Sequence, residues 1–522
     1  MPEAIGTSVR RSSSPTSRPG RTWTSPTTAS TPSKSAGPSA WKPPTWPRCA
    51  SGASFDMGSA TPAEATSGEL LDRLTGLAVE TAFSDLPPAA VDATQTFLLD
   101  SLAVGVAGRT GPWRKETLRL ALAWGHGGTA RILGDGHSVP PATAAFVNAW
   151  QMHCLEFDCV HEGAVAHVMS AVVPAALAEC ERRAVDGQRL LLALTIGVEV
   201  AAILGLAANA PLRFFRPATV GAFGAAVAVG VLRGFDAAAI RRCFGHALGQ
   251  VAGTMQAHEE GKPTLPLQLG AAARAGLVAA DLAQAGIPAP ADALEGRYGY
   301  LSLFETRSDA KSVTRQIRRP WRVTELSHKP YPSGRATHGG IEAALRLRAQ
   351  GVTSSHLRSM QLGAPPLIHQ LVIRPAHQGM NANYARLCFP YVGAVALECG
   401  RVGLDHFSDQ ALNQPALLAL AKRFTATVNE TSDPAAFVPQ TLSAELRDGR
   451  CVEVRIDDLL GSPSHPLTLE QQQAKTSTCL AAVFADASRA QRLMAAVGSL
   501  PQAADARTLL DPITNPAPRD GD

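Results

Sequence analysis

The sequence lacks the cysteine and histidine spacings that metal sites need. Its nine cysteines include no Cys-x-x-Cys pair, and Cys154 and Cys159 have no companion pair of cysteines or histidines to complete a zinc site. No glycine-rich fingerprint follows a predicted strand, so a dinucleotide cofactor is not indicated either. Scattered cysteines without partners are typical of a reducing compartment. We therefore predict a cytoplasmic protein with no metal and no cofactor.

The sequence also has little net charge and only one long hydrophobic run. The formal net charge is +4, and the first 56 residues carry seven Arg or Lys against two acids. The remaining residues are near neutral in net charge and lack the excess of Lys and Arg that nucleic-acid binding requires. The apolar run at residues 190–208 has Glu199 at its middle, and no second span accompanies it. We expect a buried helix there, and no membrane or nucleic-acid partner.

Residues 1–60 form an extension rich in Ser, Thr, Pro and Arg, with no periodic apolar pattern. Such a segment cannot offset the entropy of ordering itself, so we expect disorder. Its Arg-rich, acid-poor composition resembles a transit peptide, but its prolines argue against the amphipathic helix that such peptides form. An over-extended start, with Met57 as the first residue of the functional protein, is the alternative that we favour.

The remaining chain is long enough for two domains. Residues 61–315 read as consecutive Ala-, Leu- and Val-rich helices separated by Gly and Pro, which predicts an all-helical domain. The segment 217–232 is apolar on nearly all sides, so it is either central or packed against a second subunit. A homodimer is therefore a reasonable expectation.

In residues 316–462, strand-like segments alternate with helical ones, which predicts a smaller α+β domain that forms a lid. Segments 321–326 and 369–374 read as strands, and 444–456 as a hairpin that turns at Asp448-Gly449. Residues 463–505 return to helix-forming composition and are expected to pack back on the helical domain. Residues 506–522 are expected to be a loose tail. The predicted fold class is mainly α.

The stretch from Ser327 to His338 combines a proline-rich loop with titratable side chains. Prolines 330 and 332 predict a loop, and 339–350 reads as a helix, so His338 stands at a helix N-terminus. The positive end of the helix dipole disfavours imidazolium and attracts anions. A neutral imidazole beside an anion site suits a general base, and Lys329, Tyr331 and Arg335 lie nearby.

The stretch from Glu156 to His167 is dense in titratable groups and precedes an apolar run. Ionisable groups beside an apolar wall have shifted pKa values, so Glu156, Asp158, His161 and His167 are candidate acids and bases. A solvated turn before a helix is the alternative for His161 and Glu162.

Arg216 precedes a proline that opens a predicted helix. A guanidinium at this helix end would suit a substrate carboxylate. Capping of local carbonyl groups is the alternative for Arg216.

The run from Lys329 to His338 resembles a segment of the MmgE/PrpD family, which includes 2-methylcitrate dehydratase, cis-aconitate decarboxylase and an iminodisuccinate epimerase. Further segments resemble the family in the same order: Leu98-Leu-Asp-Ser-Leu-Ala-Val-Gly, residues 156–167, Thr219-Val-Gly-Ala-Phe-Gly-Ala-Ala, Gly253-Thr-Met-Gln-Ala-His-Glu-Glu-Gly, and Asn383-Tyr-Ala-Arg-Leu-Cys-Phe-Pro-Tyr391. The resemblance implies an all-helical domain with a smaller lid, and cofactor-free chemistry on a small polycarboxylate in the cleft between them.

By resemblance, His167 matches a family histidine implicated in the active site, although the spacing leaves His161 open as the counterpart. Arg386 and Tyr391 lie in a segment that faces the cleft in the family. The chain departs from the family at Leu265, where a lysine is common, and at Gln268, where a histidine is common. Lys262 is the nearby cation that could reach the space of the missing lysine. His258, Glu259 and Glu260 could contribute acid or base groups, and solvated polar residues at a helix end are the alternative for them.

The leading hypothesis is a carbon–oxygen lyase of the dehydratase type, or a decarboxylase. His338 or His167 would move a proton alpha to a carboxylate, Glu156 or Asp158 would orient the imidazole, and Lys329, Arg335 and Arg216 would hold carboxylates. An epimerase with two bases is the first alternative. A non-catalytic helical homologue is the second, because of Leu265 and Gln268.

Overall fold

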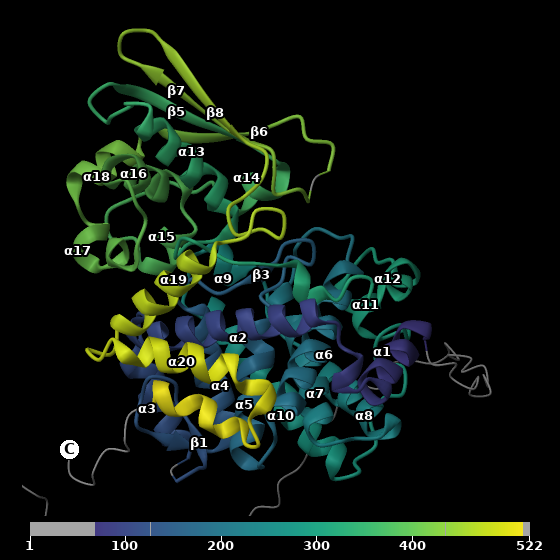
Figure 1. Cartoon of the computed structure of the whole chain (residues 1–522). Coiled ribbons are helices and arrows are strands. Elements are labelled where there is room, and N and C mark those ends of the chain that lie inside the picture. The colour runs from purple at the N-terminus through teal and green to yellow at the C-terminus, as the bar shows by residue number, and fades with distance from the viewer. Residues whose placement is uncertain (1–67, 126, 434, 515–522) are drawn as a thin grey trace, which may run out of the picture. The chain divides into compact units, whose positions relative to one another are not determined.

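Helices packed around one hydrophobic core make up the first part of the chain (Figure 1). The structure, a computed structural model, describes residues 68–125, 127–433 and 435–514. The helices of this helical domain are α1 (Glu69–Glu80), α2 (Pro88–Ala107), α3 (Arg114–Trp124), α4 (Pro141–His153), α5 (Met169–Arg182), α6 (Gly187–Leu206), α7 (Arg216–Leu232), α8 (Ala237–Leu248), α9 (Gln256–Glu259), α10 (Thr264–Gln284), α11 (Tyr300–Phe304) and α12 (Ala310–Gln316). A small antiparallel pair, β1 (Ala130–Arg131) and β2 (Ser138–Val139), connects α3 to α4.

Helices α6 and α7 are apolar on nearly all sides and lie at the centre of the helical domain. They approach closely, because a Cβ placed on Gly197 would lie 2.8 Å from the carbonyl oxygen of Gly224. Among the described residues, α6 is the one helix long and apolar enough to cross a membrane, but 89% of that stretch is buried inside the protein. The prediction of a buried helix is therefore confirmed. The apolar helix that suggested a dimer, α7, is likewise buried within a single chain.

The charged residue inside α6, Glu199, is fully buried and has backbone partners. The N–H groups of Arg318 and Arg322 donate to its carboxylate at 2.8 and 2.7 Å. Burial raises the pKa of Glu199 to about 7, although both donors oppose the shift. Glu199 thus anchors the chain where it leaves the helical domain.

A second domain has its own core and a mixed sheet of order β6-β5-β7-β8 (Figure 1). Strand β5 pairs with β6 in parallel and with β7 antiparallel, and β7 pairs with β8 antiparallel. The elements are α13 (His338–Ala349), β5 (Leu357–Ala364), α14 (Pro366–Val372), α15 (Ala382–Arg386), α16 (Phe389–Cys399), α17 (Asp409–Leu412), α18 (Pro415–Ala421), β6 (Phe424–Val428), β7 (Gln440–Leu446) and β8 (Cys451–Ile456).

The structure confirms one of the sequence-based strand assignments in this region and corrects two. The hairpin is confirmed, because β7 and β8 are joined by a turn in which Gly449 has a φ of +86°. Segment 321–326 is mainly a 3-10 helix, Arg322–Glu325, followed by the short strand β4 (Leu326–Ser327). Residues 369–372 of the segment 369–374 belong to α14, which begins at Pro366 and ends at Val372. A proline is favoured at the first position of a helix, and this signal outweighs the β-branched residues that follow.

The last helices, α19 (Leu469–Ala481) and α20 (Ser488–Gly498), return to the helical domain, where α19 packs beside α2 (Figure 1). The prediction of a loose tail from residue 506 is wrong for residues 506–513. These form a 3-10 helix, Ala506–Ile513, and bury Leu509, Leu510 and Ile513 in the core of the helical domain. The apolar side chains recur on one face of this short element. The predictions for residues 1–60, including Met57, and for 515–522 lie outside the described residues.

The two histidine-bearing stretches meet in space. We call residues 156–167 the first histidine segment and residues 327–338 the second histidine segment. Strand β3 (Val160–His161) in the first segment pairs antiparallel with β4, so that Val160 lies opposite Ser327. Segments more than 160 residues apart in the chain therefore border one site.

Candidate active site

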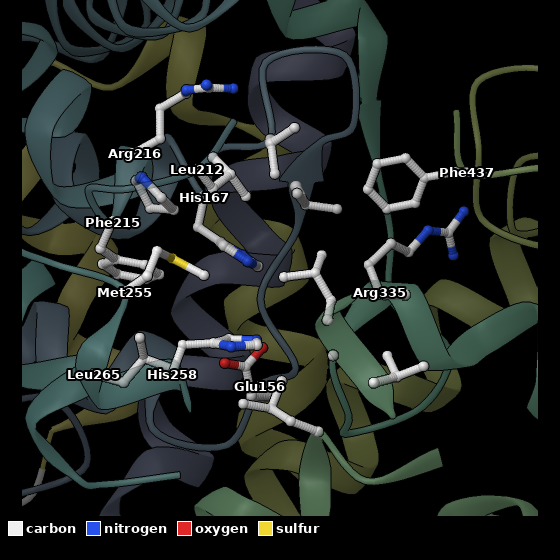
Figure 2. Close-up of a pocket in the computed structure, with 18 residues that line it drawn as sticks. Glu156, His167, Leu212, Phe215, Arg216, Met255, His258, Leu265, Arg335 and Phe437 are labelled. Carbon is white, nitrogen blue, oxygen red and sulfur yellow. The ribbon is translucent and has the colours of Figure 1, made fainter. Parts of the chain in front are cut away.

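A cavity of about 610 Å3, including its open mouth, is lined by residues of both histidine segments. Its polar lining consists of Glu156, His167, Arg216, His258 and Arg335. Figure 2 shows Glu156, His167 and His258 on one side of the cavity and Arg335 with Phe437 on the other. Most of the remaining lining is apolar. A largely apolar cavity with a few converging polar groups is the usual form of a small-molecule site.

A group of buried charged side chains, the carboxylate cluster, lies at and behind the cavity wall. It consists of His153, Glu156, Asp158 and Lys329. The Lys329 Nζ lies 3.0 Å from Glu156 Oε2 and 3.7 Å from Asp158 Oδ1. His153 Nδ1 lies 3.0 Å from Asp158 Oδ2, and His153 Nε2 lies 3.3 Å from Glu156 Oε1. Lys329 is fully buried, so it belongs to the cluster and not to the cavity lining.

The cluster balances its own charge. Burial opposes ionisation of both carboxyl groups, but Lys329 and the histidines outweigh it and lower the pKa of Glu156 to about 2. The pKa of Asp158 is also held well below its usual range, with the neighbouring histidines and Lys329 overcoming burial. Burial disfavours the imidazolium of His153, yet Asp158 and Glu156 raise its pKa. Two carboxylates thus face Lys329 and a histidine whose protonated form they favour.

His167 borders the cavity in a form that suits a base. Its Nδ1 lies 3.2 Å from the carbonyl oxygen of Cys159 and 3.1 Å from Asp158 Oδ2. A carbonyl oxygen only accepts, so Nδ1 carries the proton and donates it. Burial lowers the pKa of His167 although Asp158 opposes the shift, so the ring is neutral at pH 7. The Nε2 of neutral His167 therefore keeps a free lone pair.

Backbone strain is concentrated in the same segment. Glu156 has a φ of +50° and Val165 a φ of +49°, and both residues line the cavity. Positive φ is uncommon for residues with a Cβ and is costly for a β-branched one. Such strain persists where the surrounding structure imposes it, and it gathers at functional sites.

His338 begins α13, as the sequence predicts, but it is fully buried and does not line the cavity. Its Nδ1 accepts from Arg335 Nη1 at 3.3 Å, and its Nε2–H donates to the carbonyl oxygen of Ser333 at 3.2 Å. Burial and the nearby Arg335 hold the pKa of His338 well below its usual range. Both ring nitrogens are used, so the residue has no lone pair to offer a substrate. Its neighbour Tyr331 packs edge-on against the ring, outside the cavity.

Both ring nitrogens of His161 also have partners within the protein. Its Nδ1 accepts from the backbone N–H of Ala164 at 3.0 Å, and its Nε2 lies 3.1 Å from Glu325 Oε2. It does not line the cavity. Of the two histidines that the spacing left open, His167 is the one that borders the cavity.

The two cavity arginines are paired with acids of the protein. Arg216 Nε lies 3.3 Å from Glu305 Oε1, and Arg335 Nε lies 2.7 Å from Glu162 Oε1. Figure 2 shows both guanidinium groups pointing away from Glu156 and His258. Both arginines therefore contact the cavity mainly through their stems.

The other predicted substrate-binding residues lie away from the cavity. Lys262 is exposed on the turn before α10 and does not line the cavity. Arg386 is buried and donates to the carbonyl oxygens of Leu155 and Pro332 at 2.8 and 2.9 Å. Tyr391 is fully buried and donates to the carbonyl oxygen of His406 at 2.7 Å. In this structure Arg386 and Tyr391 hold chain segments together.

The sequence-based reasoning missed one histidine of the site and left the role of a second one open. His153 was not singled out, although its spacing to Glu156 at a helix end places both side chains on one side. His258 was left open as an acid or base group or as a solvated residue, and the structure shows it buried and lining the cavity. Arg374 Nη2 donates to His258 Nδ1 at 3.3 Å, which leaves the ring proton on Nε2. Burial and Arg374 lower the pKa of His258 to about 4, so it is a neutral donor.

The departures at Leu265 and Gln268 have different structural consequences. Leu265 is buried and lines the cavity. Gln268 turns to the backbone of Thr254, whose N–H donates to Gln268 Oε1 at 2.6 Å and whose carbonyl oxygen accepts from Nε2 at 3.3 Å. The cavity gains an apolar surface from α10 and no side-chain amide.

Three groups converge in the way that a metal site requires. Donor atoms of His153, Glu156 and His167 lie within 4.8 Å of one another. Lys329 already lies 3.0 Å from the Glu156 carboxylate, and the two carboxylates raise the pKa of His153 and so favour its protonated form, which has no lone pair for a metal. The residues present therefore fit an ion-pair network better than a metal site.

Comparison with known proteins identifies the family. The MmgE/PrpD N-terminal domain matches residues 72–313, and the MmgE/PrpD C-terminal domain matches residues 331–499. The chain is 27% identical to the cis-aconitate decarboxylase-like protein oryM of Aspergillus oryzae, over 85% of this chain and 97% of the relative. It is 27% identical to the cis-aconitate decarboxylase of Mus musculus (73% of this chain, 80% of the relative) and 26% identical to that of Aspergillus terreus (83% and 94%).

These matches indicate a lyase-type enzyme, a dehydratase or a decarboxylase. The two domain matches together cover most of the chain, in the order in which the helical and α+β domains occur. The protein therefore belongs to the MmgE/PrpD family.

Proposed function

We propose that the protein is a cofactor-independent lyase in which His167 moves a proton at a carbon alpha to a carboxylate. The observation that carries the proposal is the free Nε2 lone pair of a neutral imidazole at the wall of the cavity. A general base needs both a lone pair toward the substrate and a pKa that leaves it unprotonated at working pH.

The neighbours of His167 have supporting roles in this proposal. Asp158 and the Cys159 carbonyl oxygen hold the Nδ1–H, so they fix the ring and its tautomer. Asp158 also stabilises the imidazolium that forms when Nε2 takes the proton. His153 and Lys329 hold Asp158 and Glu156 in place as ionised groups.

His258 is proposed to face the charge that develops on the substrate. Its Nε2–H has its direction set by Arg374 on the other ring nitrogen. A preoriented neutral donor stabilises a developing carboxylate or enolate oxygen without giving up its own proton. With a pKa of about 4, His258 stays in this form above pH 5.

The proposed substrate class is a small polycarboxylate. The relatives are named for decarboxylation of cis-aconitate, which is a compound of this class. Dehydration is the reaction that the sequence-based hypothesis favours: His167 takes the alpha proton, the carbon–oxygen bond breaks, and the hydroxyl leaves as water with a proton from the imidazolium. Decarboxylation instead breaks a carbon–carbon bond, releases carbon dioxide and needs a proton at carbon, which the imidazolium form of His167 would supply. The cytoplasmic location and the homodimer remain part of the proposal, and light scattering of the purified protein tests the dimer.

The alternatives find less support in the site. An epimerase needs a second base, but the second histidine of the cavity, His258, presents a proton and not a lone pair. A non-catalytic homologue has no need of a neutral, aligned His167 at the cavity wall.

The test is proton NMR of the full-length protein in deuterated water with citrate, cis-aconitate and alkyl-substituted analogues of both. We expect an alkene signal, or deuterium entry alpha to a carboxylate, that is lost in His167→Gln. Exposed His356 offers a matched control, and His356→Gln should retain the signal. Undiminished turnover by a folded His167→Gln variant would refute the role of His167.

A further inference from the structure

The cavity has an apolar wall that a small, highly charged substrate would leave empty. This wall consists of Leu212, Phe215, Met255, Leu265, Leu371 and Phe437. We propose that the substrate carries an alkyl or aryl substituent, and that this substituent packs against the wall while the acidic carbon faces His167 and a carboxylate faces His258. The proposal rests on the proposed function and specifies its substrate.

The wall is built from separate parts of the fold. Phe215 precedes α7, Leu265 lies in the first turn of α10, and Leu371 lies in α14 of the second domain. Phe215 and Leu265 are almost fully buried, and they belong with Ala218 and Leu269 to a small apolar cluster. The apolar lining is thus contributed by both domains, as expected for a shaped pocket.

The charged side chains that line the cavity are already paired with opposite charges of the protein. Arg216 and Arg335 are paired with Glu305 and Glu162. The charge of Glu156 is matched by Lys329, and His258 is neutral. Among the described residues that line the cavity, the one buried guanidinium nitrogen without a hydrogen-bond partner is Arg335 Nη2, which is too little to bind several carboxylates. A tri-anionic substrate would lose its hydration without full compensation.

The positions of the apolar side chains relative to the two histidines also favour a substituted substrate. Figure 2 shows Phe437 across the cavity from His167, while Met255 and Leu265 lie on the same side as His258. A substrate whose acidic carbon reaches His167 therefore has its other substituents between apolar side chains. Burial of each methylene against such surfaces contributes roughly fourfold in affinity.

Binding and turnover of matched ligand pairs test the proposal separately. The pairs are succinate with butylsuccinate, succinate with phenylsuccinate, and cis-aconitate with its butyl-substituted analogue. Calorimetric titration of the full-length protein should show a dissociation constant at least about tenfold lower for the substituted member of a pair. NMR turnover on the cis-aconitate pair reports the proposed function.

The outcomes are distinct. Equal or weaker binding of every substituted member overturns the inference, and turnover of unsubstituted cis-aconitate then leaves the lyase proposal standing. Tighter binding of the substituted members without turnover of any compound supports the inference and counts against the lyase proposal.

Variants of the wall provide a second measurement. Leu371→Gln, at a half-buried position, should reduce the preference for the butyl compound several-fold, and Leu265→Lys should reverse it by adding a cation. Leu303→Gln, at an exposed position outside the cavity, is the matched control and should leave the preference unchanged. An unaltered preference in folded Leu371→Gln would overturn the assignment of the wall.

Discussion

The two histidine segments look alike in sequence and differ in what their last residue can do. Both end in a histidine, both carry charged side chains, and β3 and β4 pair them with each other. His167 uses Nδ1 inside the protein and leaves Nε2 free at the cavity, whereas His338 uses both nitrogens internally. The comparison teaches that a helix N-terminus and a neutral ring do not make a base. A histidine can act as a base only if one ring nitrogen keeps an unoccupied lone pair toward the substrate.

The largest expected effect separates these histidines directly. His167→Gln should lower turnover by roughly 10²–10⁴-fold, the usual contribution of a general base. His338→Gln should keep turnover within about tenfold, since it removes no group from the cavity. It should instead lower the free energy of unfolding by about 1–3 kcal/mol, because buried partners lose hydrogen bonds. Turnover assays and urea denaturation of both variants make the measurement. An equal loss of turnover in the two variants would contradict the comparison.

The next effect tests the contact that joins the segments. Lys329→Met should lower the free energy of unfolding by about 3–5 kcal/mol, because Glu156 and Asp158 would lose a buried counter-charge. Lys262→Met is the control, since Lys262 is exposed, and it should change stability little. Denaturant unfolding of both variants decides the matter. Near-equal stability would mean that the cluster does not depend on Lys329.

The smallest effect is a shift in pH dependence. The pKa of His167 is lowered by burial, so the acid limb of kcat/KM should have its midpoint below the ordinary histidine value of about 6.5. Below that midpoint the imidazole is protonated and activity falls about tenfold per pH unit. In Asp158→Asn the carboxylate that raises the pKa of His167 is gone, so the midpoint should move to still lower pH. A midpoint above 6.5 in the unmodified protein would contradict a neutral, buried base.

Much of the architecture could be predicted from local signals. The apolar run 190–208, the proline-rich loop before His338 and the Asp448-Gly449 turn each produced the predicted element, because composition and turn residues act over a few positions. The prediction of a strand at 369–374 is wrong because Pro366, three residues upstream, starts a helix. The β-branched residues of the segment do not oppose that helix strongly. The prediction of a loose tail is wrong for residues 506–513 because the residues against which they pack lie far away in the chain.

Some features of the candidate site could also be predicted from the sequence, and others could not. The sequence by itself determined the family, the two domains and a short set of candidate groups, since the relevant motifs are local strings of residues. Only the tertiary structure decided which histidine keeps a free lone pair, that Lys329 neutralises Glu156, and that His258 is buried beside Arg374. Hydrogen-bond partners and burial come from segments distant in sequence, and they determine the pKa and the orientation of each side chain.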